Sequence, residues 1–366
     1  MRGQSLTNRS SKGRSRPRRL LASAVVAAAF VFACAASVGF GAAPARLAAA
    51  APPVRHINLG AGPIKIGGKP LKIAFLTAAS VNAYSVAYND AAVAEAKKLG
   101  VKLTVFDANL NALTQVAQAK VALTQGYNAW VLTALSPEMC ALTKQAAKAG
   151  VLISIDNQHV CTSVYANGTA IWVPGTVNFT GGDQTGDIFT QFLMHIAATN
   201  PGAQQVALVE GTPDLAQSLL ASKAATAAEK KYPNFKVTTV VDPTYDITGA
   251  YNAVQTFLPA HSGTTILATV YSDMTEGAVK AIQHAGDTKI KVYDMGGSTW
   301  AFSAVRNGTI QLTSVFLPRT EGREAVDSLY TTWTTGKPGP HYVDVLKSVS
   351  NPFVTKANIG SRKAEY

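Results

Sequence analysis

Short apolar runs alternate with alanine-rich helical segments over most of this 366-residue sequence, and this alternation constrains the fold more than any other feature. Four runs of β-branched and aliphatic residues begin near residue 71, and a segment with helical periodicity follows each of the first three. The expected strands cover residues 71–76, 101–106, 129–133 and 151–155, and the expected helices cover 84–99, 111–125 and 138–149. Strands and helices that alternate in this way form a parallel sheet with helices on both faces.

The same alternation returns in the second half of the chain, after a stretch rich in glycine, proline and aromatic residues at 165–182. Strands are expected at 206–209, 236–241, 265–270 and 290–293, and helices at 182–199, 214–231, 247–258 and 275–285. Two similar halves predict an α/β protein with two doubly wound parallel-sheet lobes. Ligands of such sheets bind beyond the carboxyl ends of the strands, so functional residues are expected in the loops there.

The first 50 residues have the pattern of an export signal. They contain eight basic side chains and no acidic one, so most of the net charge of +12 belongs to them. An apolar stretch at 20–40 and a run of small residues at 42–51 follow, as in a cleavable signal. The apolar stretch is also long enough to cross a membrane if it is retained, and Cys34 lies in a weak likeness of a lipoprotein cleavage site. Cleavage, a lipid anchor and an uncut membrane anchor therefore all stay open, and residues 52–70 are expected to form a linker.

Two further cysteines, Cys140 and Cys161, follow two consecutive expected strands at the same edge of a sheet. Export to the periplasm or the cell surface favours a disulfide between them, because compartments outside the cytosol are oxidising. Two buried free thiols are the alternative. A zinc site is not expected, because the two cysteines and His159 supply only three ligands and no fourth is evident.

No catalytic, metal-binding or nucleotide-binding motif stands out. Gly60-Ala61-Gly62 begins like a dinucleotide-binding loop, but no strand of the alternating pattern precedes it and no helix follows it. The six histidines lie singly, and nothing assembles a nucleophile, a base and its orienting group. We therefore expect no enzyme and no bound metal or cofactor. Nucleic-acid binding is not expected either, because an export leader stands where a repressor of this architecture carries its DNA-reading domain.

Several short strings resemble, in their order and spacing, the type I periplasmic sugar-binding proteins of the ribose-binding-protein group. The resemblance runs from about residue 72 to about residue 340. It is carried by Lys72-Ile73-Ala74-Phe75, Asn82-Ala83-Tyr84, Ile153-Ser154-Ile155-Asp156-Asn157-Gln158, Tyr245-Asp246, Ser272-Asp273-Met274 and Asn307-Gly308. It implies the periplasmic-binding-protein-like I fold, in which two hinged lobes close around a sugar-like solute and deliver it to the membrane permease of an ABC transporter. We expect such a protein to act as a monomer.

The resemblance also implies where the chain crosses between its lobes. The hinge crossings are expected near residues 178–180, 316–318 and 339–345. The N-terminal lobe then takes residues 71–177 and 317–340, and the C-terminal lobe takes residues 178–316 and 341–366.

In the family that the sequence resembles, aromatic rings stack on the apolar C–H faces of a sugar, and polar side chains bind its hydroxyl groups. Tyr84 and Tyr245 match the stacking positions. Asp156 and Asn157 match a pair of an acidic and a polar residue, although the family usually has arginine at the second position. The full set of expected ligand-binding residues is Asn82, Tyr84, Thr133, Asp156, Asn157, Tyr245, Tyr271, Asp273, Asp294 and Phe316.

Ribose itself is not the expected solute. Where the ribose-binding pattern has polar residues, this chain has Ala78, Thr133, Tyr271 and Phe316. Hydrogen bonds to charged groups are worth about 1.5–3 kcal/mol each, so losing three would remove most of the roughly 8 kcal/mol that holds a micromolar complex. A deoxysugar, a polyol or a small aromatic or lactone-like molecule fits better. The alternative function is a sensing module that presents its solute to a sensor kinase or chemoreceptor, which an uncut leader would suit.

Overall fold

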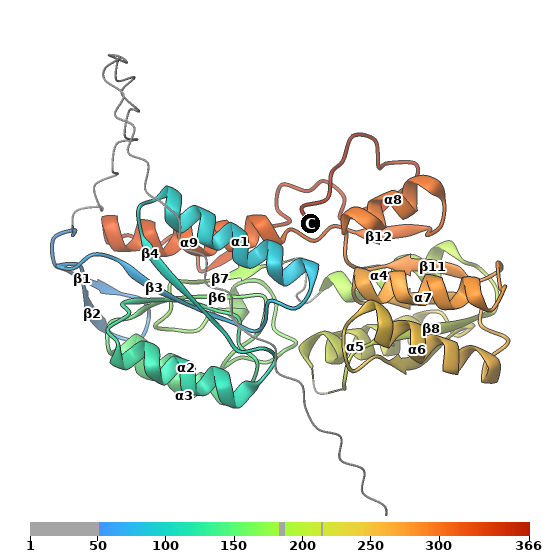
Figure 1. Cartoon of the computed structure of the whole chain (residues 1–366), viewed down its shortest axis with the longest axis horizontal. Coiled ribbons are helices and arrows are strands. Elements are labelled where there is room, and N and C mark those ends of the chain that lie inside the picture. The colour runs from blue at the N-terminus through green and yellow to red at the C-terminus, as the bar shows by residue number, and fades with distance from the viewer. Residues whose placement is uncertain (1–50, 183–186, 214) are drawn as a thin grey trace, which may run out of the picture. The chain divides into compact units, whose positions relative to one another are not determined.

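The computed structural model describes residues 51–182, 187–213 and 215–366 (Figure 1). These residues belong to one compact unit, which contains two six-stranded sheets and a separate two-stranded hairpin. The expectations for the export signal and for Cys34 fall on residues 1–50 and so lie outside the described part of the chain. Among the helices that the structure describes, none combines the length and the hydropathy that a membrane span requires.

The first sheet has the strand order β13-β7-β6-β5-β3-β4, and all its pairings are parallel. Its strands are β3 (Lys72–Thr77), β4 (Lys102–Asp107), β5 (Ala129–Leu132), β6 (Leu152–Asp156), β7 (Asn178–Gly181) and β13 (Tyr342–Asp344). Its helices are α1 (Ala83–Lys98), α2 (Ala112–Thr124), α3 (Met139–Lys148) and α9 (Pro318–Thr335), with a short helical turn η1 (Gly168–Ile171). Helices α1 and α9 pack together on one face of the sheet, and α2 and α3 cover the other (Figure 1).

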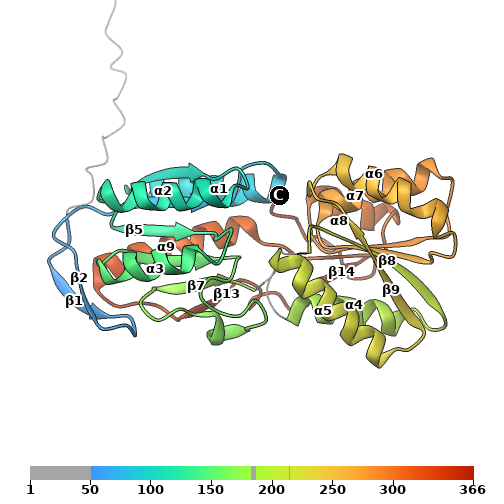
Figure 2. The same cartoon turned by 90° about the horizontal axis from the view of Figure 1, so that it is seen from below.

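The second sheet has the order β14-β12-β11-β10-β8-β9 and is parallel except for β14, which runs antiparallel to β12. Its strands are β8 (Gln204–Glu210), β9 (Phe235–Val241), β10 (Ile266–Thr269), β11 (Lys291–Asp294), β12 (Leu312–Ser314) and β14 (Phe353–Thr355). Its helices are α4 (Asp187–Thr199), α5 (Ala216–Lys231), α6 (Ile247–Phe257), α7 (Ser272–His284) and α8 (Thr299–Asn307), with the turn η2 (Leu258–Ala260). Helix α4 packs on α5, and α6 packs on α7 across the sheet from them (Figure 2).

The expected fold class is confirmed. Each expected strand and helix matches an observed one within three residues at either end, except at the start of α4. Strands β5, β6 and β10 are buried along their whole length, which explains why apolar residues dominate them and do not alternate with polar ones. Gly100, Gly126 and Gly150 have positive φ angles of 69°, 69° and 83°, as expected of glycines that end helices.

Residues 52–70 are not the simple linker that the sequence suggested, because they contain an antiparallel hairpin. Its strands are β1 (Arg55–Asn58) and β2 (Pro63–Ile66). The side-chain oxygen of Asn58 accepts hydrogen bonds from the backbone N–H groups of Gly60 at 2.9 Å and Gly62 at 3.3 Å, and so holds the turn. Both strands are short and contain polar or exposed residues, so they form no continuous apolar run, which is why the sequence pattern did not reveal them.

The expected lobe boundaries differ from the strand pairing at two places. Residues 178–181 were expected in the C-terminal lobe, but they form β7, which pairs with β6 in the first sheet. Residues 342–344 were also expected there, but they form β13, which pairs with β7. The crossings between the sheets therefore follow β7, follow β12 and follow β13. Both misassigned strands are short, and a short strand does not reveal from its own sequence which sheet it joins.

Gly322 allows α9 to lie directly on α1. A Cβ atom at this position would overlap the backbone oxygen of Tyr88 and would lie 3.2 Å from the backbone nitrogen of Ala92. Helix α9 enters the first lobe only after the chain has completed β12 of the second sheet. This close approach therefore attaches α9 to α1, the first helix in the part of the chain that the structure describes.

Candidate functional site

Tyr84 lies at the start of α1, just beyond the carboxyl end of β3. Asn82 caps this helix, because its side-chain oxygen accepts a hydrogen bond of 2.9 Å from the backbone N–H of Ser85. The hydroxyl of Ser85 in turn accepts from the backbone N–H of Asn82 at 3.3 Å. A capping box of this kind fixes the first turn of a helix and so fixes where Tyr84 leaves the backbone. Asn82, which was expected to bind the solute, has this capping role in the structure.

Tyr84 is buried, and it makes polar contacts with both lobes. Its hydroxyl donates a hydrogen bond to the carboxylate of Glu321 and accepts one of 2.8 Å from the amide of Asn157. Its backbone N–H donates a bond of 3.3 Å to the hydroxyl of Tyr271, which follows β10 of the second sheet. Tyr84 therefore connects the carboxyl edges of the two sheets.

Two further aromatic rings pack on Tyr84. The ring of Phe316 meets it edge-on with a distance of 5.9 Å between ring centroids, and the ring of Tyr366 does so at 5.6 Å. Phe316 lies where the chain crosses from β12 to α9. We use the name Tyr84 cluster for the following residues: Tyr84, Asn157, Tyr271, Phe316, Glu321 and Tyr366. Four of them belong to the set that the sequence predicted.

Asp156 ends β6 with a buried carboxyl group whose two oxygens differ in their surroundings. Its Oδ1 atom accepts a hydrogen bond of 2.6 Å from the hydroxyl of Thr133, which was also expected at the site. Its Oδ2 atom is buried and has no hydrogen-bond partner among the residues that the structure describes. Burial raises the pKa of Asp156 well above its ordinary value of 3.8. A buried acceptor of this kind can be satisfied by a hydroxyl group that a solute donates.

Asn157 has a left-handed backbone, with a φ of 56°. This turn directs the side chains of Asp156 and Asn157 to different partners. Its backbone N–H donates to the carbonyl of Thr180 at 3.1 Å, and its side-chain oxygen accepts from the amide of Gln158 at 2.9 Å. Asparagine adopts this conformation more readily than most residues. The turn lets Asp156 bind Thr133 while Asn157 binds Tyr84.

Asp294 is surrounded by protein donors. Its Oδ2 atom accepts from the hydroxyl of Ser272 at 3.0 Å, from the backbone N–H of Gly297 at 3.2 Å and from the hydroxyl of Thr313. Its Oδ1 atom accepts from the hydroxyl of Thr275. Burial raises the pKa of Asp294, and these hydrogen bonds act against that rise. Asp294 was expected to bind the solute, but in the structure it ties the start of α7 to the loop after β11.

Tyr271 and Asp273 lie at the start of α7. Burial raises the pKa of Tyr271 above its ordinary value, and the charge of Asp273 adds to the rise. Burial also raises the pKa of Asp273 to about 6, followed by the charge of Glu276. Asp273 is only half-buried, so it presents a carboxyl group that titrates near neutral pH.

Tyr245 belongs to a second group of buried polar residues in the C-terminal lobe. Its backbone is left-handed, with a φ of 55°, and its ring packs where a Cβ atom on Gly211 would overlap it. Burial raises the pKa of Tyr245 to about 12, and its hydroxyl lies beside Ser218 and Glu210. Burial raises the pKa of Glu210 to about 7, and its Oε2 atom has no hydrogen-bond partner in the described chain. The structure thus places Tyr84 in one polar group and Tyr245 in another.

Cys140, in α3, and Cys161, in the loop after β6, are joined by a disulfide in the structure, with 4.9 Å between their Cα atoms. This separation lies within the usual range for a disulfide. The bond holds the loop that follows Asp156 and Asn157 against α3. In the described ranges, no three His, Cys, Asp or Glu side chains gather as a metal site would require.

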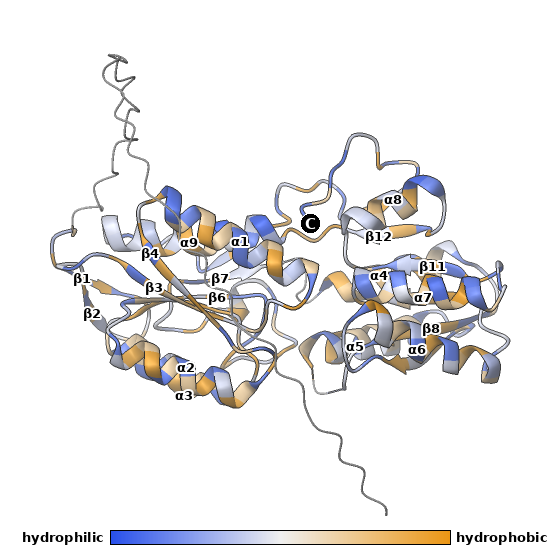
Figure 3. Ribbon diagram, in the orientation of Figure 1, coloured by the Kyte–Doolittle hydropathy of each residue, from blue (hydrophilic) through white to orange (hydrophobic). Residues whose placement is uncertain are grey.

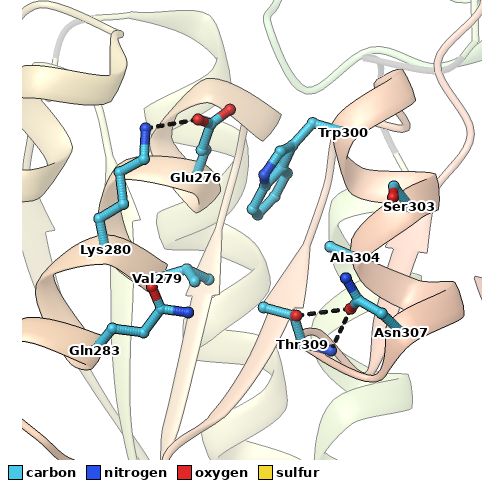
Figure 4. Close-up of a pocket in the computed structure, with 9 residues that line it drawn as sticks. All are labelled: Glu276, Val279, Lys280, Gln283, Trp300, Ser303, Ala304, Asn307 and Thr309. Carbon is cyan, nitrogen blue, oxygen red and sulfur yellow. Dashed lines mark hydrogen bonds and ion pairs between the residues drawn. The ribbon is translucent and has the colours of Figure 1, made fainter.

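A surface depression of about 170 Å³ lies between α7 and α8 (Figure 4). Its lining includes Glu276 and Lys280, which form an ion pair of 2.6 Å. It also includes Asn307, whose side-chain oxygen accepts a hydrogen bond of 2.9 Å from the backbone N–H of Thr309. These polar groups satisfy one another, and none of the lining residues was predicted to bind a solute. We therefore place the candidate site at the Tyr84 cluster and not in this depression.

The sequence did not reveal Glu321 and Tyr366 as members of the site. Glu321 lies in the first turn of α9, a helix that was not expected. Pro318 at the start of that helix and an acidic residue in its first turn are typical signals of a helix start, and they could have revealed it. No signal in the sequence points to Tyr366.

Comparisons with known proteins agree with this fold. A family model described as a periplasmic binding protein domain matches residues 73–338. The ribose import binding protein of Salmonella typhimurium is 25% identical over 259 residues, which cover 70% of this chain and 82% of that protein. The D-apiose import binding protein of Paraburkholderia graminis is 26% identical over 293 residues, which cover 79% of this chain and 88% of that protein.

Solved structures share the two-lobed fold. An ABC transporter solute binding protein from Mycobacterium smegmatis with bound glycerol matches with a TM-score of 0.70 and 23% identity, covering 81% of this chain and 99% of its own. The myo-inositol binding protein of Caulobacter, bound to myo-inositol, matches with a TM-score of 0.66 and 21% identity, covering 80% and 95%.

Proposed function

Since the chain belongs to the periplasmic binding protein domain family, we propose that it captures a small polyhydroxylated solute between its two lobes and delivers it to the permease of an ABC transporter. Its relatives are import binding proteins and not enzymes. The activity to explain is therefore recognition and release, and no chemical step is needed.

The observation that carries this proposal is the buried, unpartnered Oδ2 atom of Asp156. It lies at the carboxyl end of β6, one residue before Asn157, which binds the hydroxyl of Tyr84. A solute hydroxyl would donate to this oxygen, and the rings of Tyr84 and Phe316 would pack against the solute's C–H groups. A molecule with hydroxyl groups on a carbon skeleton supplies both features.

The proposed solutes are polyols and sugars whose hydroxyl groups need few hydrogen bonds from the protein. Solved relatives of the fold have glycerol, myo-inositol, allitol or D-allose bound. In this chain the Thr133 hydroxyl is occupied by Asp156, and both Asp294 oxygens are occupied by protein donors. Phe316 adds an apolar ring. These residues support a polyol or deoxysugar over ribose.

Solute binding would favour the closed form through contacts with both lobes. Asp156 and Tyr84 contribute from the first lobe, and Tyr271 and Asp273 contribute from the second. A ligand can shift a conformational equilibrium only if it binds one state more tightly than the other. The segments that cross between the sheets would absorb the hinge motion.

We propose that the mature chain works outside the cytosol as a monomer. The export pattern of residues 1–50 supports this location, and so does the pairing of Cys140 with Cys161, because such bonds persist in oxidising compartments. Residues of a single chain supply both sides of the site. The permease is the proposed membrane partner.

Isothermal titration of the mature protein with glycerol, allitol, myo-inositol, D-allose and D-ribose tests the proposal. We expect at least one of the others to bind more tightly than ribose, and mass spectrometry to recover it unaltered. Tyr84→Ala and Asp156→Ala should each weaken that binding at least tenfold, since hydrogen bonds to charged groups are worth about 1.5–3 kcal/mol. Asp90→Ala, which removes an exposed acid on α1, is the matched control. Unchanged affinity in both site variants would show that the site is misplaced.

A further inference from the structure

We propose that Tyr366 is a built-in occupant of the solute site, which an incoming solute must displace from Tyr84. The identity of the site rests on the function proposed above, whereas the contacts of Tyr366 are independent of it. We call residues 359–366 the tail segment.

Tyr366 contacts both lobes through different atoms. Its ring packs edge-on against Tyr84 of the first lobe, with 5.6 Å between ring centroids. Its hydroxyl donates a hydrogen bond of 2.7 Å to the backbone oxygen of Gly296, in the loop after β11 of the second lobe. Its carbonyl oxygen accepts bonds of 2.6 Å from both the backbone N–H and the hydroxyl of Thr299, at the start of α8.

The neighbouring Glu365 binds the first lobe, at the start of α9. Its carboxylate accepts hydrogen bonds of 3.0 Å from the backbone N–H of Thr320 and 2.5 Å from the Thr320 hydroxyl, in the first turn of α9. Its carbonyl oxygen accepts a bond of 2.7 Å from the guanidinium of Arg319. A carboxylate is favoured there because the N-terminus of a helix carries a partial positive charge. Two adjacent residues of the tail segment therefore bridge the lobes.

The earlier part of the tail segment is fixed to the second lobe. Ile359 is buried, and Arg362 donates a hydrogen bond of 2.8 Å to the backbone oxygen of Asn351. Arg306, in α8, donates a bond of 2.8 Å to the carbonyl of Arg362. Displacing Tyr366 therefore needs movement of only the residues after Arg362.

Tyr366 presents an apolar ring to Tyr84, as the C–H groups of the proposed solute would. An aromatic ring offers apolar faces and edges, and its hydroxyl offers one hydrogen-bond donor. Burial raises the pKa of Tyr366 well above its ordinary value, and the charges of Tyr271 and Asp294 add to the rise. An attached group acts at an effective concentration in the millimolar range, so it competes with a free solute. The apparent affinity then falls in proportion to the fraction of sites that Tyr366 leaves free.

Substitutions in the full chain show whether the Tyr366 side chain competes with the solute or forms part of the surface that binds it. If Tyr366 is an occupant, Tyr366→Ala should tighten the binding of the best polyol at least fivefold in isothermal titration. Lys363→Ala, which removes an exposed side chain of the same segment, should leave the affinity unchanged. Weaker or unchanged binding by Tyr366→Ala would overturn the inference.

A readout that needs no solute keeps this inference distinct from the proposed function. Fluorine NMR of protein labelled with 3-fluorotyrosine, with Tyr366→Phe used for assignment, reports the environment of the Tyr366 ring. We expect a resonance away from that of an exposed tyrosine, and Tyr84→Ala should move it. A Tyr366 resonance at the exposed position that ignores Tyr84→Ala refutes the inference, whereas the absence of any binding sugar or polyol refutes only the proposed function.

Discussion

The backbone N–H of Tyr84, at the start of α1, donates a hydrogen bond of 3.3 Å to the hydroxyl of Tyr271, beside the start of α7. The bond joins the lobes directly, because α1 covers the first sheet and α7 covers the second. Its donor is a backbone group, so no change to the side chain of Tyr84 removes it. Loss of the Tyr271 hydroxyl does.

Tyr271→Phe should therefore weaken solute binding about fivefold, because a neutral hydrogen bond contributes about 1 kcal/mol and this one supports the closed form. Isothermal titration measures the change. Tyr251→Phe is the control, since its hydroxyl bonds His284 at 2.9 Å within the second lobe and should not affect affinity. Equal affinities in the two variants would contradict a role of the Tyr271 hydroxyl in closure.

Solute affinity should rise with pH, because Asp156, whose pKa is raised, ionises as the pH increases. Burial raises this pKa in the solute-free protein, so the carboxyl stays protonated over a wider pH range than usual. A solute hydroxyl that donates to Oδ2 favours the ionised form and lowers the pKa, so binding strengthens as the pH rises and then levels off. Titrations across about pH 5 to 8 test this. Asp156→Asn should remove the part of the pH dependence that comes from Asp156. Any part that comes from Asp273 or Glu210 should remain.

The same shift predicts the effect of Asp156→Asn on stability. The folded pKa of Asp156 exceeds its unfolded value, so its contribution to the free energy of unfolding is full below pH 3.8 and is lost as the pH rises through the folded pKa. An asparagine amide does not ionise, so burying it costs no such stability at neutral pH. Asp156→Asn should therefore be at least as stable as the parent at neutral pH, although it should bind the solute more weakly. Denaturant unfolding at acidic and neutral pH measures it, and a large loss of stability at neutral pH would count against this account.

The disulfide should contribute about 3 kcal/mol to the free energy of unfolding, because it closes a loop with a sequence separation of 21 residues. The double variant Cys140→Ser, Cys161→Ser should show this loss in denaturant unfolding. Adding reductant to the parent protein should reproduce the effect but should not change the double variant. Equal unfolding midpoints for the parent in oxidising and reducing buffer would contradict the prediction.

Gly322→Ala should lower the free energy of unfolding by about 1–3 kcal/mol, because its Cβ would meet the backbone of α1. Gly339→Ala is the control, since a Cβ atom there meets nothing within 4 Å and the position has no positive φ. That variant should be neutral or stabilised by about 0.4–1 kcal/mol. Similar losses in both variants would show that the close approach of α9 to α1 does not matter.

The regular parts of both lobes could be predicted because their strands are buried on two faces and therefore form visible apolar runs. The short strands β7, β13 and β14 could not, because they contain few aliphatic residues and their pairing depends on distant segments. Part of the Tyr84 cluster could be predicted because its residues follow strands of this visible kind. Tyr84 and Asn157 follow predicted strands, whereas Glu321 bonds Tyr84 from 237 residues away in the sequence.

The chemistry of a residue also did not reveal its orientation. An aspartate at the end of β11 was a reasonable candidate to bind hydroxyl groups. Four protein donors around Asp294 occupy it instead, and their arrangement depends on the loop after β11 and on Thr313. Sequence spacing placed Asp156 and Asp294 at the carboxyl ends of their strands, but it did not indicate that protein donors surround Asp294.

The order in which the strands complete the sheets has a consequence for biogenesis. Strand β13 adds to the first sheet and β14 adds to the second, so residues 342–355 finish both. Neither lobe can reach its final pairing on the ribosome until that stretch has emerged. Until then both sheets of the nascent polypeptide lack an edge strand, and this leaves time for export factors to engage it before folding is finished.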